Sequence, residues 1–255
     1  MNFYRSVWTV WLRHYSVFRK NIVYGMVTTF VEPILYLGSF GFGLGAVIGN
    51  IEAGGEQVSY RAFVLAGLIG QTLLFTSFFD GAYGGFIRMY YQKIFQAISV
   101  TPVTLSEVLW GELLWCSSRG LLSASVILLI GGVLGDFSWW GCVVALPVIF
   151  LASVLFASVG MLVAAGSRTI ESISYPQYLV IFPMFLFCGV YFPLSQLPEW
   201  GQAIAAVLPL TALLSVVRTL LLGFQFEWWA LPLLVAWTIP FIPLARNAMR
   251  RRVVA

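Results

Sequence analysis

Long apolar runs separated by short polar segments make up most of the chain. Six of these runs approach or exceed the roughly 20 residues that a helix needs to cross the hydrocarbon core of a bilayer. They cover residues 22–48, 62–83, 108–134, 139–165, 174–192 and 228–245. The pattern therefore predicts an all-α membrane protein with six transmembrane helices in one transmembrane domain, residues 1–255.

A further apolar stretch, residues 193–223, is interrupted by helix breakers. These are Pro193, Pro198, Pro209 and Gly223. At 1.5 Å of rise per residue, the pieces between them reach about 15 Å and about 20 Å, which is less than the ~30 Å hydrocarbon core. Backbone that enters a membrane without crossing it must be buried against protein. We therefore expect an extracytoplasmic re-entrant helical hairpin before the last span.

The first 21 residues have the pattern of an amphipathic helix. Aromatic residues recur at steps of four and three on one side, and basic and polar residues fall on the other side. The residues expected at the interface include Trp8, Trp11, Arg13, Arg19 and Lys20. Such a helix lies in the membrane interface, with its rings at the acyl boundary and its cations at the head groups. The alternative is that the segment forms the cytoplasmic end of the first span, but the number of aromatic residues favours the interfacial helix.

Residues 86–103 are expected to form a second amphipathic helix, between the second and third spans. One face carries Ile87, Tyr91, Ile94, Phe95 and Ile98, and the other carries Arg88, Gln92, Lys93 and Gln96. The helix should end at Thr101-Pro102, because proline disfavours helix in the preceding residue. Thr104 and Glu107 then fit a capping box that begins the next span. The residues alone favour two interpretations equally: a connector resting on the head groups, or a docking helix for a soluble partner.

Composition agrees with the membrane class. The chain is 60% hydrophobic and 9% charged, with a mean hydropathy of +0.91. A soluble domain carries roughly 25% charged residues. A soluble fold of this length is therefore excluded, and we expect lipid to surround the helices.

Basic residues gather in the segments that this topology places on one side. All but three of the 14 lysines and arginines fall in the N-terminal helix, the loops 86–103 and 167–172, and the tail 246–252. Cytoplasmic segments of membrane proteins carry such an excess of Lys and Arg. The distribution predicts that both chain ends are cytoplasmic, and it does not form the basic stripe of a nucleic-acid-binding protein.

Among the ionisable residues within apolar runs, four are candidates for a role in the bundle: Glu32, Glu112, Arg119 and Arg218. Such residues usually face a bundle interior or water, because they are costly in lipid. Glu112 and Arg119 are seven positions apart, too far for an i,i+4 pair, and an interhelical clamp is favoured over a role in a substrate path. Glu32 equally fits a kink at Pro33. Arg218 fits either an anionic head group or backbone carbonyls at a helix end.

Few residues point to catalysis. His14 is the only histidine, and on an interfacial helix it is expected to contact head groups. Cys116, Cys142 and Cys188 stand alone in apolar runs. A membrane-embedded lipid-modifying enzyme needs clustered acids, bases or metal ligands. We therefore disfavour that function and expect neither catalytic residues nor a metal site.

Several segments together resemble the permeases of ABC-2 type transporters. They are residues 95–103 (FQAISVTPV), 107–112 (EVLWGE), 187–198 (FCGVYFPLSQLP) and 208–211 (LPLT), with Arg218. The early stretches 11–20, 32–37 and 43–45 are similar to the branch that contains nodulation protein J, a permease proposed to export lipochitooligosaccharide. The resemblance covers nearly the whole chain. Daunorubicin-type drug exporters share much of the same pattern.

The resemblance implies a permease subunit of the bacterial inner membrane that forms a homodimer and binds two copies of an ABC ATPase on its cytoplasmic side. Residues 86–101 would be the coupling helix. The residues expected to meet the ATPase are Arg88, Tyr91, Gln92, Lys93, Phe95, Thr101 and Pro102. The cargo would be an amphipathic glycolipid or lipo-oligosaccharide moved outward, and multidrug export is the alternative.

The resemblance also implies that ATP and Mg are bound by the partner ATPase. A Walker A loop needs Gly-Lys followed by Ser or Thr. The two lysines of this chain, Lys20 and Lys93, follow Arg19 and Gln92 instead. We therefore expect no cofactor in this chain, and ATP hydrolysis on another subunit.

Overall fold

The computed structural model describes residues 2–99 and 101–254, apart from the side chains at positions 24, 26, 28, 29, 32, 96, 99, 253 and 254. The roles expected for the side chain of Glu32 therefore lie outside the described residues.

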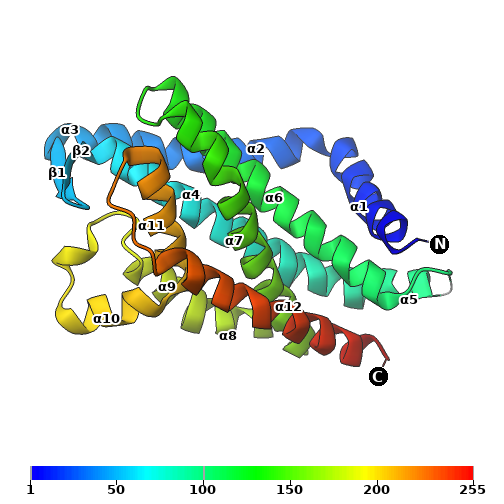
Figure 1. Ribbon diagram of the computed structural model, residues 1–255. Coiled ribbons are helices and arrows are strands. Elements are labelled where there is room, and N and C mark those ends of the chain that lie inside the picture. The colour runs from blue at the N-terminus through cyan, green and yellow to red at the C-terminus, as the bar shows by residue number, and fades with distance from the viewer. Residues whose placement is uncertain (1, 100, 255) are drawn as a thin grey trace.

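Helices make up most of the described chain (Figure 1). In chain order the elements are α1 (Phe3–Lys20), α2 (Ile22–Tyr36), the π-helical η1 (Leu37–Leu44), α3 (Gly45–Ile48), β1 (Asn50–Ala53), β2 (Glu56–Ser59), α4 (Tyr60–Phe79), the π-helical η2 (Asp80–Gly84) and η3 (Ile87–Tyr91), α5 (Ile94–Ser99), α6 (Leu105–Val133), α7 (Trp139–Gly166), the 3₁₀ turn η4 (Glu171–Ile173), α8 (Ser174–Pro176), the π-helical η5 (Gln177–Ile181), α9 (Phe182–Phe187), the 3₁₀ turn η6 (Leu194–Gln196), α10 (Glu199–Val207), α11 (Pro209–Leu222) and α12 (Ala230–Val254).

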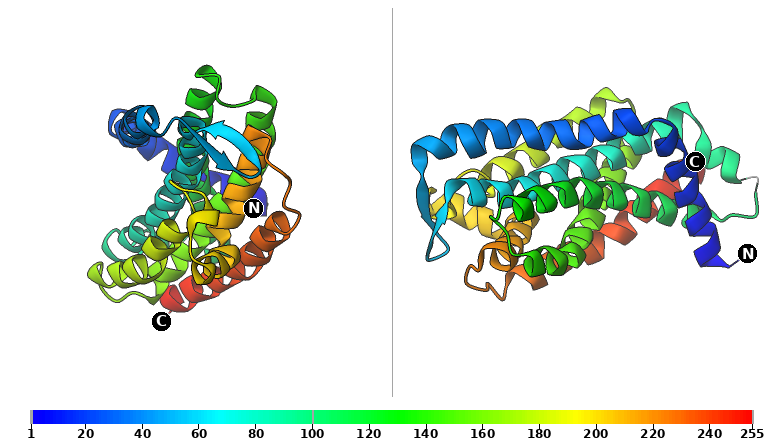
Figure 2. Two further views of the ribbon diagram at one scale, coloured as in Figure 1. Left: turned by 90° about the vertical axis from the view of Figure 1, so that its left-hand side faces the viewer. Right: turned by 90° about the horizontal axis from the view of Figure 1, so that it is seen from above.

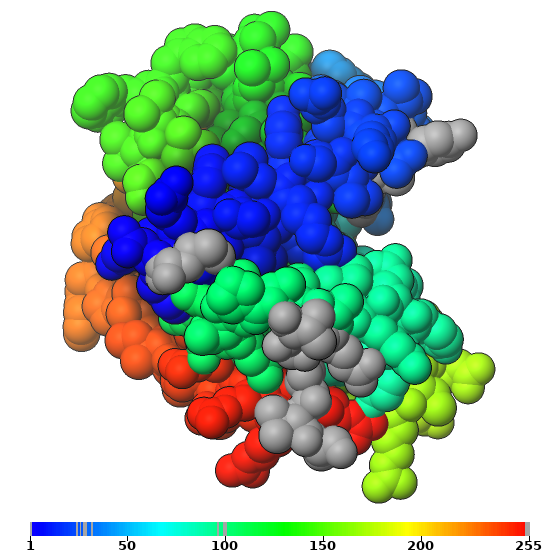
Figure 3. All heavy atoms as spheres, turned by 90° about the vertical axis from the view of Figure 1, so that its right-hand side faces the viewer, coloured from blue at the N-terminus to red at the C-terminus, as the bar shows by residue number. Residues whose placement is uncertain are grey.

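The long helices lie side by side, and the molecule has two different ends (Figures 1 and 2). The terminal end carries α1, α5, the last turns of α12 and both chain termini; Figure 3 shows this end. The hairpin end carries α3, the β1–β2 hairpin, α10 and α11. Helix α1 turns sharply away from the direction of α2 (Figure 2). The two ends correspond to the two sides that the sequence distinguishes by charge.

Four helical stretches are long and apolar enough to span a membrane: Tyr60–Tyr91, Leu105–Val133, Trp139–Gly166 and Ala230–Arg252. A fifth arises if α10 and α11, which are bent by 86° at their junction, count as one span. In the part of the chain that the structure describes, the first predicted span contributes the shorter apolar helix Pro33–Ile48. The protein is thus a mostly helical membrane protein with several spans.

The fifth predicted span, 174–192, is shorter than expected. Its helix ends at Phe187, and Gly189 follows with a φ of +74°. Residues 174–187 rise about 21 Å, less than the ~30 Å core. The apolar run continues past this turn, so the hydrophobic pattern alone overestimates the helix. By contrast, α12 continues beyond the predicted end at 245 and carries the arginines 246–252 in helical form.

The expectation of an all-α protein is wrong at one place. The polar loop after the first span is an antiparallel hairpin in which Ala53 pairs with Glu56. Gly54 and Gly55 form its two-residue turn, with φ of +62° and +80°. Two-residue hairpin turns favour such glycines, because both central residues need positive φ.

The single helix expected over 86–103 is divided in two. Residues up to Tyr91 continue the helix of α4, and the chain breaks at Gln92 and Lys93, where Lys93 has a φ of +49°. Helix α5 then packs against α6. As a result Tyr91 is 68% exposed whereas Phe95 is 1% exposed, although the sequence placed both on one face. The capping box at Thr104 is confirmed.

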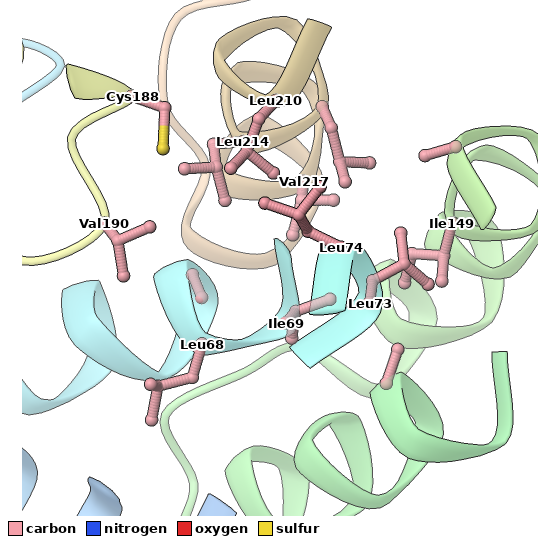
Figure 4. Packing of buried hydrophobic residues seen from close by; sticks show 14 of the residues in the cluster. Leu68, Ile69, Leu73, Leu74, Ile149, Cys188, Val190, Leu210, Leu214 and Val217 are labelled. Atoms are coloured by element: carbon pink, nitrogen blue, oxygen red, sulfur yellow. The ribbon is translucent and has the colours of Figure 1, made fainter. Parts of the chain in front are cut away.

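The core of the bundle lies between α4, α6, α7 and α11. Figure 4 shows Leu74 of α4 beside Val217 of α11, and Leu73 belongs to the same buried cluster. The backbones of α4 and α7 approach closely: a Cβ atom on Gly160 would lie 2.4 Å from the carbonyl oxygen of Phe78. Small residues at such crossings are typical of membrane helices. This tight bundle holds the side chains described next.

Candidate functional site

A buried ion cluster joins three helical segments toward the terminal end. Glu112 of α6 lies at its centre and is 1% exposed. Its Oε2 is 2.8 Å from Nε of Arg88, on the extension of α4, and its Oε1 is 2.8 Å from Nε2 of His14, on α1. The Nη2 of Arg88 also donates to the backbone oxygen of Asp80 at 3.0 Å, and its Nη1 lies 3.4 Å from Asp80 Oδ1. The cluster, Asp80–Arg88–Glu112–His14, therefore ties α1, α4 and α6 together.

These contacts change the interpretation of two residues. The head-group contact expected for His14 is wrong, because its side chain is buried against Glu112. Arg88 was expected on an exposed polar face, and its side chain is only 12% exposed. Burying a charge is costly unless it is paired and hydrogen-bonded, and Glu112 and Asp80 supply the pairing for Arg88. The geometry of Glu112 is that of an interhelical clamp.

Aromatic rings pack beside the cluster, between α1 and α6. The ring of Trp115 stacks on His14 at a centroid distance of 5.6 Å, and Nε1 of Trp11 donates to Oγ of Ser118 at 3.1 Å. Arg119 does not join the cluster; its guanidinium lies 5.1 Å from the centroid of the Phe18 ring. One face of α1 is thus attached to α6 through rings as well as charges.

The interfacial set divides between the two faces of α1. Trp8, Arg19 and Lys20 are exposed, while Trp11 and Arg13 are partly buried toward α6. Burial lowers the pKa of the Arg13 guanidinium from its usual value, and the charge of Glu112 opposes this shift. The exposed residues leave one side of α1 free for head groups, and the other side holds the helix in place.

The residues expected to meet an ATPase separate into an exposed group and a buried group. Tyr91, Gln92, Lys93, Thr101 and Pro102 are exposed. In sequence they flank α5, which lies at the terminal end (Figure 1). Phe95 is buried among residues of α6, including Val108 and Leu109, and Arg88 is held in the ion cluster. The exposed group is called the α5 surface below. It is presented by a segment that is anchored at both Arg88 and Phe95.

A second buried arginine lies at the hairpin end. Arg218 of α11 is 7% exposed, and its Nη2 donates to the carbonyl oxygens of Gly189 at 2.8 Å and Val190 at 3.3 Å. Its guanidinium carbon is 3.7 Å from the centroid of the Phe63 ring. No carboxylate among the described side chains forms an ion pair with it. Of the two partners expected from the sequence, the structure provides the carbonyls at a helix end.

Arg218 borders a pocket of about 430 Å³. The pocket lies between α11, the turn of the β1–β2 hairpin and the loop 223–229, and its lining includes Phe63, Leu214, Phe224 and Trp229. Cys188 also borders it, from the turn that Figure 4 shows beside α11. This volume falls within the range of small-molecule sites.

Three polar residues of these contacts were not singled out from the sequence. Asp80 is an acid in an apolar run, which is itself a signal of burial, and it partners Arg88. Arg61 and Asp136 form a two-pronged ion pair at the hairpin end, with Nε–Oδ2 at 2.8 Å and Nη2–Oδ1 at 2.9 Å. The charge pattern placed both on one side of the membrane, but nothing local to either residue indicates the pairing.

The described residues contain no group of three or more His, Cys, Asp or Glu side chains placed to hold a metal ion. All three cysteines are free and buried.

Comparison with known proteins gives consistent matches over most of the chain. The family model described as ABC-2 type transporter matches residues 5–222. Nodulation protein J of Bradyrhizobium diazoefficiens is 34% identical over 216 residues, which cover 84% of this chain and 81% of that protein. Nodulation protein J of Rhizobium meliloti is 35% identical over 214 residues, 84% and 80% of the two chains. The inner membrane transport permease YadH of Escherichia coli is 24% identical over 215 residues, 84% and 82%.

Proposed function

The chain belongs to the ABC-2 type transporter family, and from this premise we propose that it is the permease subunit of an exporter for an amphipathic glycolipid or lipo-oligosaccharide. The similarity to nodulation protein J supports this cargo class over the drugs of daunorubicin-type exporters. The cargo would move outward across the inner membrane, and a separate subunit would hydrolyse ATP with Mg.

The proposed topology has six spans and cytoplasmic termini. Both termini lie at one end of the molecule, together with the exposed arginines of α12 (Figure 1). The 86° bend between α10 and α11 supports a re-entrant hairpin at the opposite, outer end. The direction of α1, and its exposed Trp8, Arg19 and Lys20, support an interfacial helix.

The proposed docking site for the ATPase is the α5 surface. We expect two ATPase subunits on a homodimer of this chain, one on each copy. The observation that carries this proposal is the contrast between the exposed Tyr91 and its buried neighbours Arg88 and Phe95. A displacement of Tyr91 would be transmitted to α6 through Phe95 and Glu112, and to α1 through His14. Arg88 and Phe95 thus act as positioning residues, while the α5 surface makes the contact.

We also propose that the substrate path passes one of the charged residues within the bundle. Glu112 is paired with Arg88 and His14, and Arg119 lies on Phe18, so both have partners within the bundle. Arg218 borders an open pocket. Of the described candidates, Arg218 is therefore the one best placed to meet cargo.

A single substitution tests the docking proposal. We expect Tyr91→Ala to abolish copurification with the ATPase subunit and cargo-stimulated ATP hydrolysis in liposomes, because it removes an exposed ring without opening the core. Tyr178→Ala is the matched control, since Tyr178 is 66% exposed on a different helix. Phe95→Ala is unsuitable as the primary test, because Phe95 is buried and its loss would disturb folding.

The outcome of the same assay separates the alternatives. ATP hydrolysis stimulated by a lipo-oligosaccharide but not by daunorubicin supports the proposed cargo, and the reverse result supports drug export. Normal coupling by the Tyr91→Ala variant would rule out the α5 surface as the docking site. Turnover of a lipid substrate by the purified chain without any ATPase would instead revive the membrane-enzyme hypothesis.

A further inference from the structure

The pocket at the hairpin end contains polar atoms that have no hydrogen-bond partner among the described residues. Thr211 of α11 is 3% exposed, and its Oγ1 has no hydrogen-bond partner among the described residues. Nε of Arg218 likewise has none. Both residues line the pocket. Buried donors without partners are rare in folded proteins and call for an explanation, such as a bound ion or ligand.

The charge of the pocket is equally incomplete. Arg218 is 7% exposed and is balanced by two carbonyl oxygens and the Phe63 ring, but by no carboxylate among the described side chains. Glu227, the acid that borders the same pocket, is exposed and accepts a hydrogen bond from Ser215. An anion that entered past Glu227 would meet an uncompensated cation at depth.

Apolar side chains also line the pocket, beside polar ones such as Gln202, Ser215 and Gln225. Phe63, Leu214, Phe224 and Trp229 face the same space of about 430 Å³. A free inorganic ion has no apolar surface to bury against these side chains, whereas an amphiphile can bury its methylene groups against them. Burial of each methylene strengthens binding about fourfold.

We propose that this pocket binds the acidic head group of an amphiphile, a phosphate, sulfate or carboxylate, between Arg218 and Thr211. The guanidinium supplies the charge, the Thr211 hydroxyl donates a hydrogen bond, and the rings of Phe224 and Trp229 contact the first methylene groups. Binding needs neither ATP nor a partner. That the bound molecule is exported cargo rests on the proposed function, whereas the binding site does not.

Binding can be measured on the full-length chain in a non-ionic detergent. The probes are dihexanoyl phosphatidic acid, dihexanoyl phosphatidylcholine and inorganic phosphate, and the readout is the rise in unfolding temperature with ligand concentration. We expect saturable stabilisation by phosphatidic acid at concentrations at least tenfold below those needed for the choline lipid. Inorganic phosphate with the same affinity as phosphatidic acid would identify a free anion as the source and overturn the amphiphile.

The sharpest variant is Thr211→Val. It removes a hydroxyl that no described residue pairs with, so the unfolding temperature without ligand should stay the same or rise. Binding should weaken about two- to tenfold, the worth of one hydrogen bond. Thr72→Val is the matched control: Thr72 is also 3% exposed, its Oγ1 is also without a partner among the described residues, and it does not line the pocket.

Arg218→Met and Arg218→Lys complete the series. We expect at least a tenfold loss of phosphatidic acid binding for Arg218→Met and a smaller loss for Arg218→Lys, which keeps the charge. If Arg218→Met does not fold, Thr211→Val decides the question. No saturable stabilisation, or equal weakening by Thr211→Val and Thr72→Val, would overturn the site. Such a failure leaves ATPase copurification untouched and is therefore distinct from a failure of the export proposal.

Discussion

The two buried arginines of this protein have opposite surroundings. Arg88 lies near the terminal end between two carboxylates, Glu112 at 2.8 Å and Asp80 at 3.4 Å. Arg218 lies at the hairpin end beside carbonyl oxygens and the ring of Phe63, with a pocket next to it. A cation that is fully paired within the fold holds helices together. A cation left without a counter-charge beside open space is suited to receiving one.

The comparison also separates the two ends of the molecule by their roles. Near the terminal end, α1, α4 and α6 are joined through one cluster, so a displacement of one helix is passed to the others. At the hairpin end, α10 and α11 meet at an 86° bend, and the lining of the pocket combines residues of these helices with residues of loops and of the β1–β2 hairpin. The first arrangement fits the proposed transmission of movement between helices, and the second fits the proposed binding of a ligand.

The largest effect is expected from Glu112→Leu. Removal of one member of a buried ion pair leaves Arg88 and His14 without their shared partner and costs about 3–5 kcal/mol. The free energy of unfolding in mixed micelles measures this loss. Glu56→Gln is the control, because Glu56 is exposed on the β1–β2 hairpin. A loss below about 1 kcal/mol for Glu112→Leu would show that the cluster is not a clamp and would remove the contrast with Arg218.

A smaller effect is expected at the hairpin turn, where two adjacent glycines differ in their surroundings. A Cβ atom on Gly54 would lie 2.5 Å from the ring of Phe224, whereas one on Gly55 would meet only the side-chain amide of Gln225, at 3.7 Å. Both have positive φ, so alanine costs about 1–2 kcal/mol at either position. Only Gly54→Ala must also displace Phe224, at a further cost of about 1 kcal/mol.

The comparison of the two variants therefore measures how much the Phe224 ring contributes to ligand binding. Gly54→Ala should weaken phosphatidic acid binding several-fold more than Gly55→Ala, as measured by the same thermal titration. Equal binding by the two variants would mean that Phe224 does not contact the ligand. The proposed site would then rest on Arg218 and Thr211 alone.

The sequence predicted the helices better than their contacts. Hydrophobic runs indicated the long helices, because a helix surrounded by lipid or by the protein core must carry apolar side chains. The capping box at Thr104 marked the start of α6 correctly. The fifth run misled, because apolar residues continue past the turn at Gly189. The hairpin was missed although Gly54-Gly55 is a turn signal, since four-residue strands carry little pattern.

The candidate sites were predictable as residues and not as arrangements. Glu112 and Arg218 stood out because charges in apolar runs are costly. The partner of Glu112 did not, because the π-helical segments η2 and η3 change which face Arg88 presents. Spacing rules assume a regular α-helix, and a π-helical turn shifts every later residue. The pocket depends on loops that come together only in the folded chain.

The smallest effect concerns an ion pair that resembles the Arg88 pair in distance but not in burial. Arg61 and Asp136 meet at 2.8 Å with side-chain exposures of 33% and 7%, so one partner is open to solvent, whereas Arg88 and Glu112 are 12% and 1% exposed. Ion pairs open to solvent contribute about 0.2–1 kcal/mol, and salt screens them. Asp136→Asn should therefore lower the free energy of unfolding by about 0.5 kcal/mol, and by less in 1 M salt. The control is Glu199→Gln, because Glu199 is exposed and forms no ion pair with a described residue. This control should leave the free energy of unfolding unchanged. A loss as large as that of Glu112→Leu would mean that distance, rather than burial, sets the strength of pairs in this protein, and the distinction drawn between its two ends would fail.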